Sequence, residues 1–269
     1  MAQNQVPGSP LEVVAIPMDL AWQDPAENVA RMRAALAALP SSSMPRLCVF
    51  PELTLTGFTT VNPAAFALKE SEPVLQTVRD LAREFNTSLV FGYPELLPTG
   101  QVKNALSYVG RDGAEWARYH KMHLFTQGAS PETATYTAGD HPVIVEDEGW
   151  KIGLSICFDL RFPELFRKYA QEGCHLILLS ACWVGGPTKS TQFRALSAGQ
   201  AVISQSFVVA LNRTGKDPFC QFEGEALIHG PRGEALESKV GERAIATLDP
   251  ALLKGARNLD VLSSLRDRY

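Results

Sequence analysis

Apolar and polar positions along the chain fall into two kinds of segment that follow each other in turn. Short apolar runs of strand length lie between turn-forming residues, and longer segments carry apolar residues at helical spacing. The predicted strands cover 11–16, 46–50, 88–92, 105–109, 114–119, 143–146, 151–156, 175–180 and 206–211, with three short strands after them. The predicted helices cover 25–39, 72–85, 163–172 and 189–203. Strands that alternate with helices predict an α/β protein, and the hairpin around 111–113 makes its sheets mixed.

Two helix starts carry their own sequence signals. Asp24 can cap the first helix, with Pro25 in its first turn and Glu27 placed for a capping box. Ser71 can cap the second helix. These signals predict where the first two helices begin.

The composition is that of an ordinary globular protein and narrows the class of partner. The chain has 269 residues and a net charge of −4, without a cluster of lysine or arginine. This argues against nucleic acid or an anionic membrane as the main partner. No apolar run approaches the roughly 18 residues of a membrane span, and residues 1–10 lack the pattern of a signal peptide. Without a linker or an internal repeat, we expect residues 1–269 to form one domain.

The cysteines predict reduced thiols rather than a disulfide framework or a metal site. They are odd in number, mostly lie in strand-like runs, and match no metal-ligand spacing. The five are Cys48, Cys157, Cys174, Cys182 and Cys220. Because this usage suits a reducing compartment, we expect a cytoplasmic location, and we expect neither a metal nor another cofactor.

Cys157 is the strongest candidate for a reactive group. It ends the apolar run 151–156, and Pro163 lies near the start of the helix that follows. A cysteine on a sharp turn from strand to helix projects its sulfur away from the sheet, near backbone N–H groups that stabilise a thiolate. That position suits a nucleophile. A buried structural cysteine is the alternative, because free cysteine is among the most buried residue types.

Two charged residues, Glu52 and Lys121, are candidates for the base and the oxyanion donor that a cysteine nucleophile needs. Glu52 follows the strand 46–50, and Pro51 forces the chain out of the sheet there. Ligands collect outside the carboxyl ends of strands in open α/β sheets, so Glu52 can act as a general base, with a solvated loop glutamate as the alternative. Lys121 lies among apolar and aromatic residues and can donate to an oxyanion, with a surface lysine as the alternative.

Together these segments resemble the nitrilase, or carbon–nitrogen hydrolase, superfamily. Pro51-Glu52-Leu53 is similar to the family's glutamate motif, 121–125 to its lysine motif and 157–164 to its nucleophile motif, in the family's order. Three further segments resemble the C-terminal strands and turn of the family, namely 212–215, 222–225 and 231–234. The resemblance extends from about residue 11 to residue 248.

The resemblance implies a fold and an assembly. Family members are four-layer α-β-β-α sandwiches that usually pair into dimers. We therefore expect such a sandwich, and a homodimer or higher homo-oligomer. Residues 250–269 are then a C-terminal arm that can reach a partner subunit.

The resemblance also implies a Glu–Lys–Cys triad. Glu52 then takes the proton from Cys157, whose sulfur attacks a carbonyl carbon. Lys121 and the backbone N–H of Phe158 hold the resulting oxyanion. A second glutamate often follows the lysine in the family, and Glu132 is the candidate, expected to orient Lys121 or the substrate amide. An ordinary loop carboxylate is the alternative for Glu132.

Four residues are expected to contact the substrate. They are Phe58, Phe158, Arg161 and Trp183. Arg161 lies where related carbamoyl-amino-acid hydrolases bind a substrate carboxylate, and a guanidinium can pair with one in bidentate fashion. An ion pair with Asp159 or Glu164 is the alternative for Arg161. Aromatic side chains are common walls of small-molecule pockets.

The chain departs from the family pattern near the helix 189–203. It has Gln-Ala-Val-Ile-Ser at 200–204, where relatives often carry Arg-Ala-Ile-Glu-Asn. It also has Gln192-Phe193 where relatives usually have His-Trp. These changes leave the triad in place and alter the support around it.

The segment 157–163 looks most like the branch that contains ω-amidases and deaminated-glutathione amidases. We therefore expect an amidohydrolase that releases ammonia from a small amide bearing a carboxylate. An α-keto-acid ω-amide such as α-ketoglutaramate is the first candidate substrate, an N-carbamoyl amino acid the second, and a nitrile the third. A catalytically silent, dimeric binding module of the same fold is the alternative from another class.

Overall fold

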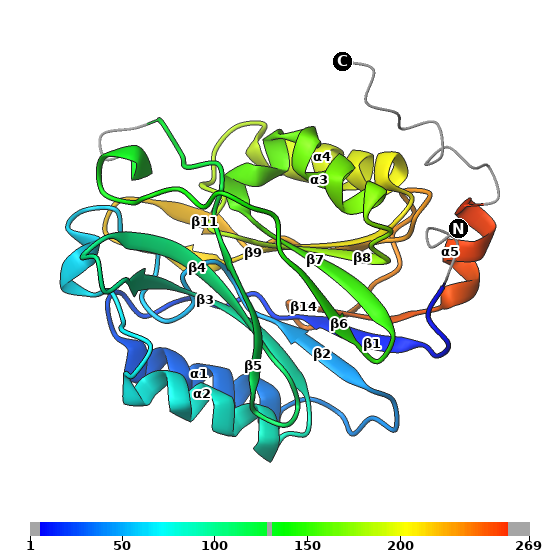
Figure 1. Cartoon of the computed structure of the whole chain (residues 1–269), viewed down its shortest axis with the longest axis horizontal. Helices are drawn as coiled ribbons and strands as arrows, with labels where there is room; N and C mark the ends of the chain where they lie inside the picture. The colour runs from blue at the N-terminus through cyan, green and yellow to red at the C-terminus, as the bar shows by residue number, and fades with distance from the viewer. Residues whose placement is uncertain (1–5, 128–130, 258–269) are drawn as a thin grey trace.

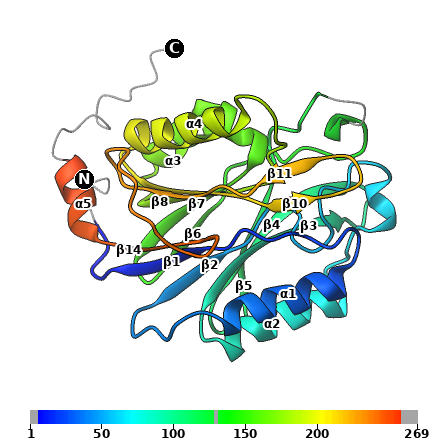
Figure 2. The same ribbon diagram turned by 180° about the vertical axis from the view of Figure 1, so that it is seen from behind.

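Two β-sheets packed face to face form the centre of the molecule, and helices cover their outer faces (Figure 1). The computed structural model describes residues 6–127 and 131–257. The layers follow one another as α-β-β-α, and Figure 2 shows the same order from behind. The predicted α/β sandwich is confirmed.

The first sheet has seven strands in the order β13-β14-β1-β2-β3-β4-β5. Its members are β1 (Leu11–Ala15), β2 (Arg46–Val49), β3 (Ser88–Leu96), β4 (Val102–Val109), β5 (Glu115–His120), β13 (Ser238–Val240) and β14 (Arg243–Leu248). β1, β2 and β3 are parallel, and their other neighbours are antiparallel. The sheet is therefore mixed, as the hairpin pattern predicts.

The second sheet has five strands in the order β12-β9-β8-β7-β6. Its members are β6 (Ile144–Asp147), β7 (Trp150–Ile156), β8 (Leu176–Ala181), β9 (Phe207–Asn212) and β12 (Ala226–His229). β7, β8 and β9 are parallel, so their carboxyl ends meet at one edge. A separate ribbon joins β10 (Thr214–Lys216) to β11 (Gln221–Glu223).

Two pairs of helices close the outer faces. α1 (Pro25–Ala37) and α2 (Pro73–Glu84) cover the seven-stranded sheet, and α3 (Pro163–Gln171) and α4 (Lys189–Ser204) cover the five-stranded sheet. A fifth helix, α5 (Pro250–Arg257), lies at one end of the molecule.

The alternation of side chains along the strands builds two apolar layers. In β1, Val13 and Ala15 belong to the core between the sheets, whereas Val14 and the adjoining Ile16 pack toward α1 and α2. The inner core also holds polar groups that cross between the sheets. Asp147 Oδ2 accepts from Ser88 Oγ and from Tyr108 Oη, each at 2.6 Å. These buried bonds fix the relative position of the two sheets.

Most predicted elements are confirmed, and three local predictions are corrected. Asp24 caps α1 by accepting from the Glu27 N–H at 3.0 Å, but the Glu27 carboxylate pairs with Arg31. The predicted cap by Ser71 is wrong, because α2 begins at Pro73 with Glu72 at the cap position and without a side-chain bond there. In the described part of the chain, five strands follow β9 rather than three, and three of them, β10, β11 and β13, have only three residues each and so leave little periodicity to recognise.

β3 is longer than predicted and continues to Leu96. β2 pairs with it only as far as Val90, so the later residues hydrogen-bond to β4 without β2 on their other side. Proline has no backbone N–H to donate to a neighbouring strand. Pro94 is tolerated because β2 does not continue beside it and needs no such donor.

The predicted C-terminal arm lies partly in the described chain. Residues 250–257 form α5, and the buried Arg257 donates to the Cys174 carbonyl oxygen at 2.5 Å. The rest of the arm, 258–269, lies outside the described residues. Its contact with a partner subunit stays a prediction.

Gly92→Ala tests the close approach of β3 to the turn that carries Glu52. A Cβ on Gly92 would lie 2.4 Å from Leu53 N and 3.1 Å from the Glu52 carbonyl carbon, so backbone has to move. We expect a loss of about 1–3 kcal/mol in the free energy of unfolding, the usual scale of overpacking. Thermal and denaturant unfolding measure it.

Gly199→Ala is the matched control for that substitution. A Cβ on Gly199 in α4 meets no atom within 4 Å. The change should stabilise the protein by about 0.5–1 kcal/mol, because alanine is the better helix former. Equal effects of the two substitutions would contradict the close approach at Gly92.

Candidate active site

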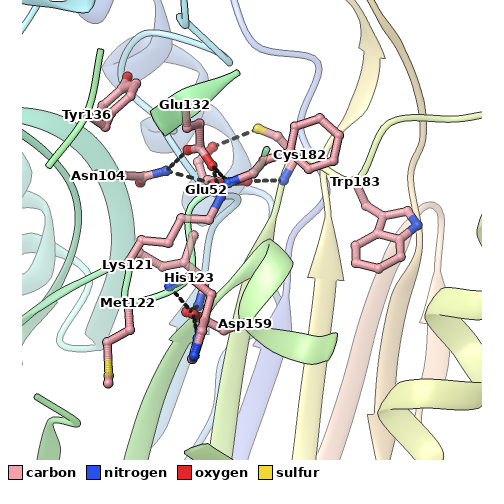
Figure 3. Close-up of polar contacts among 12 residues, drawn as sticks. Glu52, Asn104, Lys121, Met122, His123, Glu132, Tyr136, Asp159, Cys182 and Trp183 are labelled. Atoms are coloured by element: carbon pink, nitrogen blue, oxygen red, sulfur yellow. Dashed lines mark hydrogen bonds and ion pairs between the residues drawn. The ribbon is translucent and has the colours of Figure 1, made fainter. Parts of the chain in front are cut away.

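Glu52 lies in a tight turn at the C-terminal end of β2. The turn passes through Leu53 with a φ of 47°, and the Glu52 carboxylate is fully buried. Its Oε1 accepts from Asn104 Nδ2 at 2.8 Å and from Lys121 Nζ at 2.7 Å (Figure 3). Its Oε2 accepts from the Cys182 N–H at 2.6 Å. Glu52 is therefore not a solvated loop residue.

Lys121 follows β5 and its ammonium lies between two carboxylates (Figure 3). Nζ lies 2.7 Å from Glu52 Oε1 and 2.7 Å from Glu132 Oε2, and all three side chains are fully buried. Burial alone would lower the pKa of Lys121, but the two carboxylates raise it well above its ordinary value. Lys121 is thus a charged interior residue, and the surface-lysine alternative is wrong.

Glu132 lies in the segment after Lys121 and is held from three sides. Its Oε1 accepts from Asn104 Nδ2 at 3.0 Å, and its Oε2 accepts from the Phe125 N–H at 2.7 Å as well as from Lys121. Its own N–H donates to the Phe125 carbonyl oxygen at 2.9 Å. The structure therefore places Glu132 against Lys121, as the resemblance implies, and not in a solvated loop.

Cys157 lies directly after β7 with a φ of 45°, in the left-handed region. Non-glycine residues rarely adopt this conformation, and strained positions of this kind cluster at functional sites. The residue is 8% exposed, and it lines a cavity that Lys121 also lines. The structure thus brings the predicted nucleophile and the predicted oxyanion donor to one cavity.

The surroundings of Cys157 favour the protonated thiol over the thiolate. Burial raises the pKa of Cys157 well above its ordinary value, and the charge and hydrogen bonding of Glu52 raise it further, against the opposite effect of Lys121. A base must therefore accept the proton before the sulfur attacks. Glu52 is the carboxylate whose charge contributes most to this shift after burial.

Asp159 ties the nucleophile turn to the segment around Lys121. Its carboxylate accepts from Tyr119 Oη at 2.8 Å, from His123 N–H at 3.0 Å and from Ile156 N–H at 2.8 Å. Figure 3 shows Asp159 beside His123. The ends of β5 and β7, which belong to different sheets, are thereby held together.

The cavity beside Cys157 has a volume of about 180 Å³ and an aromatic wall. The four residues expected to contact the substrate all line it, namely Phe58, Phe158, Arg161 and Trp183. Phe125 stands edge-on to Phe158, with ring centroids 5.4 Å apart. This wall favours a small, partly apolar substrate.

Arg161 is held at the cavity by contacts that the sequence did not indicate. Its Nη2 donates to Gln192 Oε1 at 2.6 Å, and its guanidinium carbon lies 4.8 Å from the centre of the Trp183 ring. No ion pair joins Arg161 to Asp159 or Glu164 within residues 6–127 and 131–257. The guanidinium is exposed at the cavity and oriented by an amide and an aromatic face.

Trp183 in turn is fixed by its neighbours. Its N–H donates to Asn212 Oδ1 at 2.7 Å, and its Nε1 donates to the Lys189 carbonyl oxygen at 3.1 Å. Phe193 packs beside its ring with centroids 5.4 Å apart. Gln192 and Phe193, which both depart from the family pattern, thus support Arg161 and Trp183.

Sequence reasoning missed Asn104 and the backbone of Cys182. Asn104 bonds both glutamates of the cluster from within β4. A carboxamide directly before the apolar pair Ala105-Leu106 of this strand is the signal that could have found it, because a buried amide needs partners. The Cys182 N–H carries no side-chain signal at all.

The described residues show neither a metal cluster nor a membrane span. In residues 6–127 and 131–257, no three His, Cys, Asp or Glu side chains lie together as metal ligands. Within the same ranges, no helix has the length and apolar character that crossing a bilayer requires.

The chain is similar to known proteins over nearly its whole length. Residues 12–258 match the family model described as carbon-nitrogen hydrolase. A 2-oxoglutaramate amidase of Bacillus subtilis is 27% identical over 244 residues, covering 91% of this chain and 92% of the relative. A deaminated glutathione amidase of Synechocystis is 32% identical over 205 residues, covering 70% and 72%.

Among solved structures, Nit3 of Saccharomyces cerevisiae, a member of branch 10 of the nitrilase superfamily, aligns with a TM-score of 0.86. The alignment covers 98% of this chain and 99% of that chain, at 23% identity. At this identity the likeness concerns the fold.

Glu52→Gln should shift the alkylation of Cys157 by iodoacetamide to lower pH. The substitution removes the negative charge that raises the pKa of the thiol, so the thiolate forms more readily. Rates measured at a series of pH values, with peptide mapping to separate Cys157 from the half-buried Cys220, test this shift.

Glu95→Gln is the control, because Glu95 is another buried glutamate, paired with Arg118 and His120. It should leave the alkylation profile of Cys157 unchanged. A profile that is also unchanged in Glu52→Gln would contradict the electrostatic link between Glu52 and the thiol.

Proposed function

We propose that this chain, which belongs to the carbon–nitrogen hydrolase family and is a hydrolase that acts on amides, cleaves a small carboxylate-bearing amide through a cysteine thioester. Two of its relatives are named as amidases. One observation carries this proposal: Cys157 lies in one cavity with Lys121, and Lys121 is held by Glu52 and Glu132. A base, a cation and a nucleophile thus surround the place of a substrate carbonyl.

In the proposed first half of the reaction, the Cys157 proton passes to Glu52 as the sulfur forms a bond to the amide carbon. The carbonyl π electrons move to the oxygen, where Lys121 and the Phe158 N–H stabilise the negative charge. The C–N bond then breaks, and Glu52 gives the proton to the departing nitrogen, so ammonia leaves. An acyl group remains on Cys157 as a thioester.

In the second half, water replaces the amine. Glu52 takes a proton from a water molecule as its oxygen attacks the thioester carbon, and the same donors stabilise the second oxyanion. The C–S bond breaks, the acid product leaves, and the proton returns from Glu52 to the Cys157 sulfur. Each half uses one carboxylate both as base and as acid.

The charge of the buried cluster stays constant through these steps. With a neutral thiol, Glu52, Lys121 and Glu132 together carry one net negative charge. When the proton moves to Glu52, that charge moves to the sulfur and Lys121 still faces it. Because no net charge enters or leaves the interior, the transfer avoids a large desolvation cost.

Arg161 and the named relatives support the substrate class. A guanidinium at the cavity offers a planar partner to a carboxylate, and relatives carry the names 2-oxoglutaramate amidase and deaminated glutathione amidase. An α-keto-acid ω-amide is therefore our first candidate, with an N-carbamoyl amino acid second and a nitrile third. The homodimer and the cytoplasmic location stay predictions.

Cys157→Ala should abolish ammonia release from α-ketoglutaramate and leave thermal unfolding nearly unchanged, because it removes the nucleophile and only one small group. Cys174→Ala is the matched control, since Cys174 is also a buried free cysteine but does not line the cavity beside Cys157, and it should keep its activity. Mass spectrometry of the wild-type protein should show the acyl group on Cys157. A variant that still turns over would contradict the mechanism, and a wild type that neither acylates nor releases ammonia from any candidate would support the binding-module alternative.

Arg161→Lys should raise KM for acidic amides by roughly tenfold, which corresponds to about 1.4 kcal/mol. A point charge replaces the planar fork that a carboxylate engages at two points. The rise should disappear with a neutral isostere of the same substrate. If acidic and neutral amides slow equally and the melting temperature falls, Arg161 has a structural role and the carboxylate binds elsewhere.

A further inference from the structure

Asn104 in β4 contacts all three charged residues of the buried cluster. Its Nδ2 donates to Glu52 Oε1 at 2.8 Å and to Glu132 Oε1 at 3.0 Å (Figure 3). Its carbonyl oxygen accepts from the Lys121 N–H at 2.9 Å. The residue is fully buried and does not line the cavity beside Cys157. Asn104 therefore acts on the cluster and not on a molecule in the cavity.

The amide of Asn104 joins two carboxylates that carry the same charge. Lys121 supplies one positive charge to the pair, so Glu52, Lys121 and Glu132 together keep one net negative charge. A second cation would cancel that charge, whereas an amide NH₂ adds two donors and no charge. Hydrogen bonds from a neutral donor favour the ionised form of a buried carboxylate. Asn104 thus supports both glutamates and leaves the cluster the negative charge that accepts a proton.

Tyr136 lies close to the same two glutamates but does not replace Asn104 (Figure 3). Its Oη donates to the Thr59 carbonyl oxygen at 2.7 Å, so its one hydroxyl hydrogen is used there. Within the part of the chain that the structure describes, Asn104 is the neutral side chain that bonds both glutamates.

These bonds also determine which Glu52 oxygen is open to a proton. Oε1 accepts from Asn104 and from Lys121, and two donors fill the lone-pair positions of that oxygen. Among the described residues, Oε2 accepts from one N–H, that of Cys182, and so keeps a position open. Cys182 follows β8 and Cys157 follows the neighbouring β7, so Oε2 is the oxygen on the side of the thiol.

We propose that Asn104 is a positioning residue for the proposed amide hydrolysis, which holds Glu52 with Oε2 toward Cys157 and Glu132 against Lys121. The proposal rests on the proposed function, and Asn104 itself exchanges no proton with the substrate. When Oε2 takes the proton of Cys157, the bond from Asn104 to Oε1 remains. The protonated side chain therefore stays oriented to give the proton to the departing nitrogen.

Asn104→Leu tests this role, because leucine keeps the approximate shape and removes both donors. We expect kcat for ammonia release from α-ketoglutaramate to fall about tenfold to hundredfold, the scale of hydrogen bonds to charged groups. KM should stay nearly the same, since Asn104 does not line the cavity.

The pH profile of kcat/KM gives a second readout of the same variant. Without the two donors the ionised form of Glu52 is less favoured, so activity is lost at higher pH as the solution is acidified. The acid limb of the profile should move up by about one pH unit or more.

Tyr108→Phe is the matched control. Tyr108 lies on the same strand, and its Oη donates to the buried Asp147 carboxylate at 2.6 Å, whereas neither residue lines the cavity. This substitution also removes a neutral donor from a buried carboxylate. It should lower the melting temperature and leave kcat and the acid limb unchanged.

Asn104→Ser is the second variant. Its single hydroxyl hydrogen serves at most one glutamate, so kcat and the acid limb should change in the same directions and by less than in Asn104→Leu. If the leucine variant does not fold, the serine variant decides.

The outcomes separate the two proposals. A folded Asn104 variant with the kcat and the acid limb of the wild type overturns the role of Asn104, even if it melts earlier, and leaves the amidase function standing. A rise in KM at unchanged kcat overturns the role as well. A wild type that releases ammonia from none of the candidate amides overturns the proposed function, and the role of Asn104 falls with it.

Discussion

A lysine ammonium held between two carboxylates in the interior is the interaction on which the site depends. Three charged groups without water are costly to bury, and they are stable only because each is paired and further hydrogen-bonded. Glu52 comes from the end of β2, Lys121 from the end of β5 and Glu132 from the segment after it, while Asn104 of β4 bonds both glutamates. Removal of the Lys121 charge would leave two buried carboxylates without a counter-charge, so both glutamates depend on this one ammonium.

The elements that the sequence predicts best are those with a strong local signal. β1, β7 and α3 were predictable because apolar runs and helical spacing report directly on burial. The start of α2 was not, because Ser71 is a possible cap whose hydroxyl the structure does not use. Of the strands after β9, β10 and β13 have only three residues each, so neither length nor alternation marks them clearly.

In the candidate site too, some residues could be predicted from local sequence signals and others could not. Glu52 and Cys157 were predictable since they follow buried strands, where side chains of parallel sheets converge. The contact between Arg161 and Gln192 was not, because it joins separate elements and depends on how α4 lies over the sheet. Gln200, another departure from the family pattern, donates to the Leu160 carbonyl oxygen at 3.4 Å. Gln192 and Phe193 thus contact proposed substrate-binding residues, and Gln200 contacts the residue before Arg161.

The polar cluster and the nucleophile belong to different sheets. Glu52, Asn104 and Lys121 come from the seven-stranded sheet, and Cys157, Cys182 and Trp183 come from the five-stranded one. The hydrogen bond from the Cys182 N–H to Glu52 crosses the interface between the two sheets. A chain with only one sheet formed therefore carries either the base or the thiol, never the pair. The reactive centre therefore exists only where the two sheets are packed against each other.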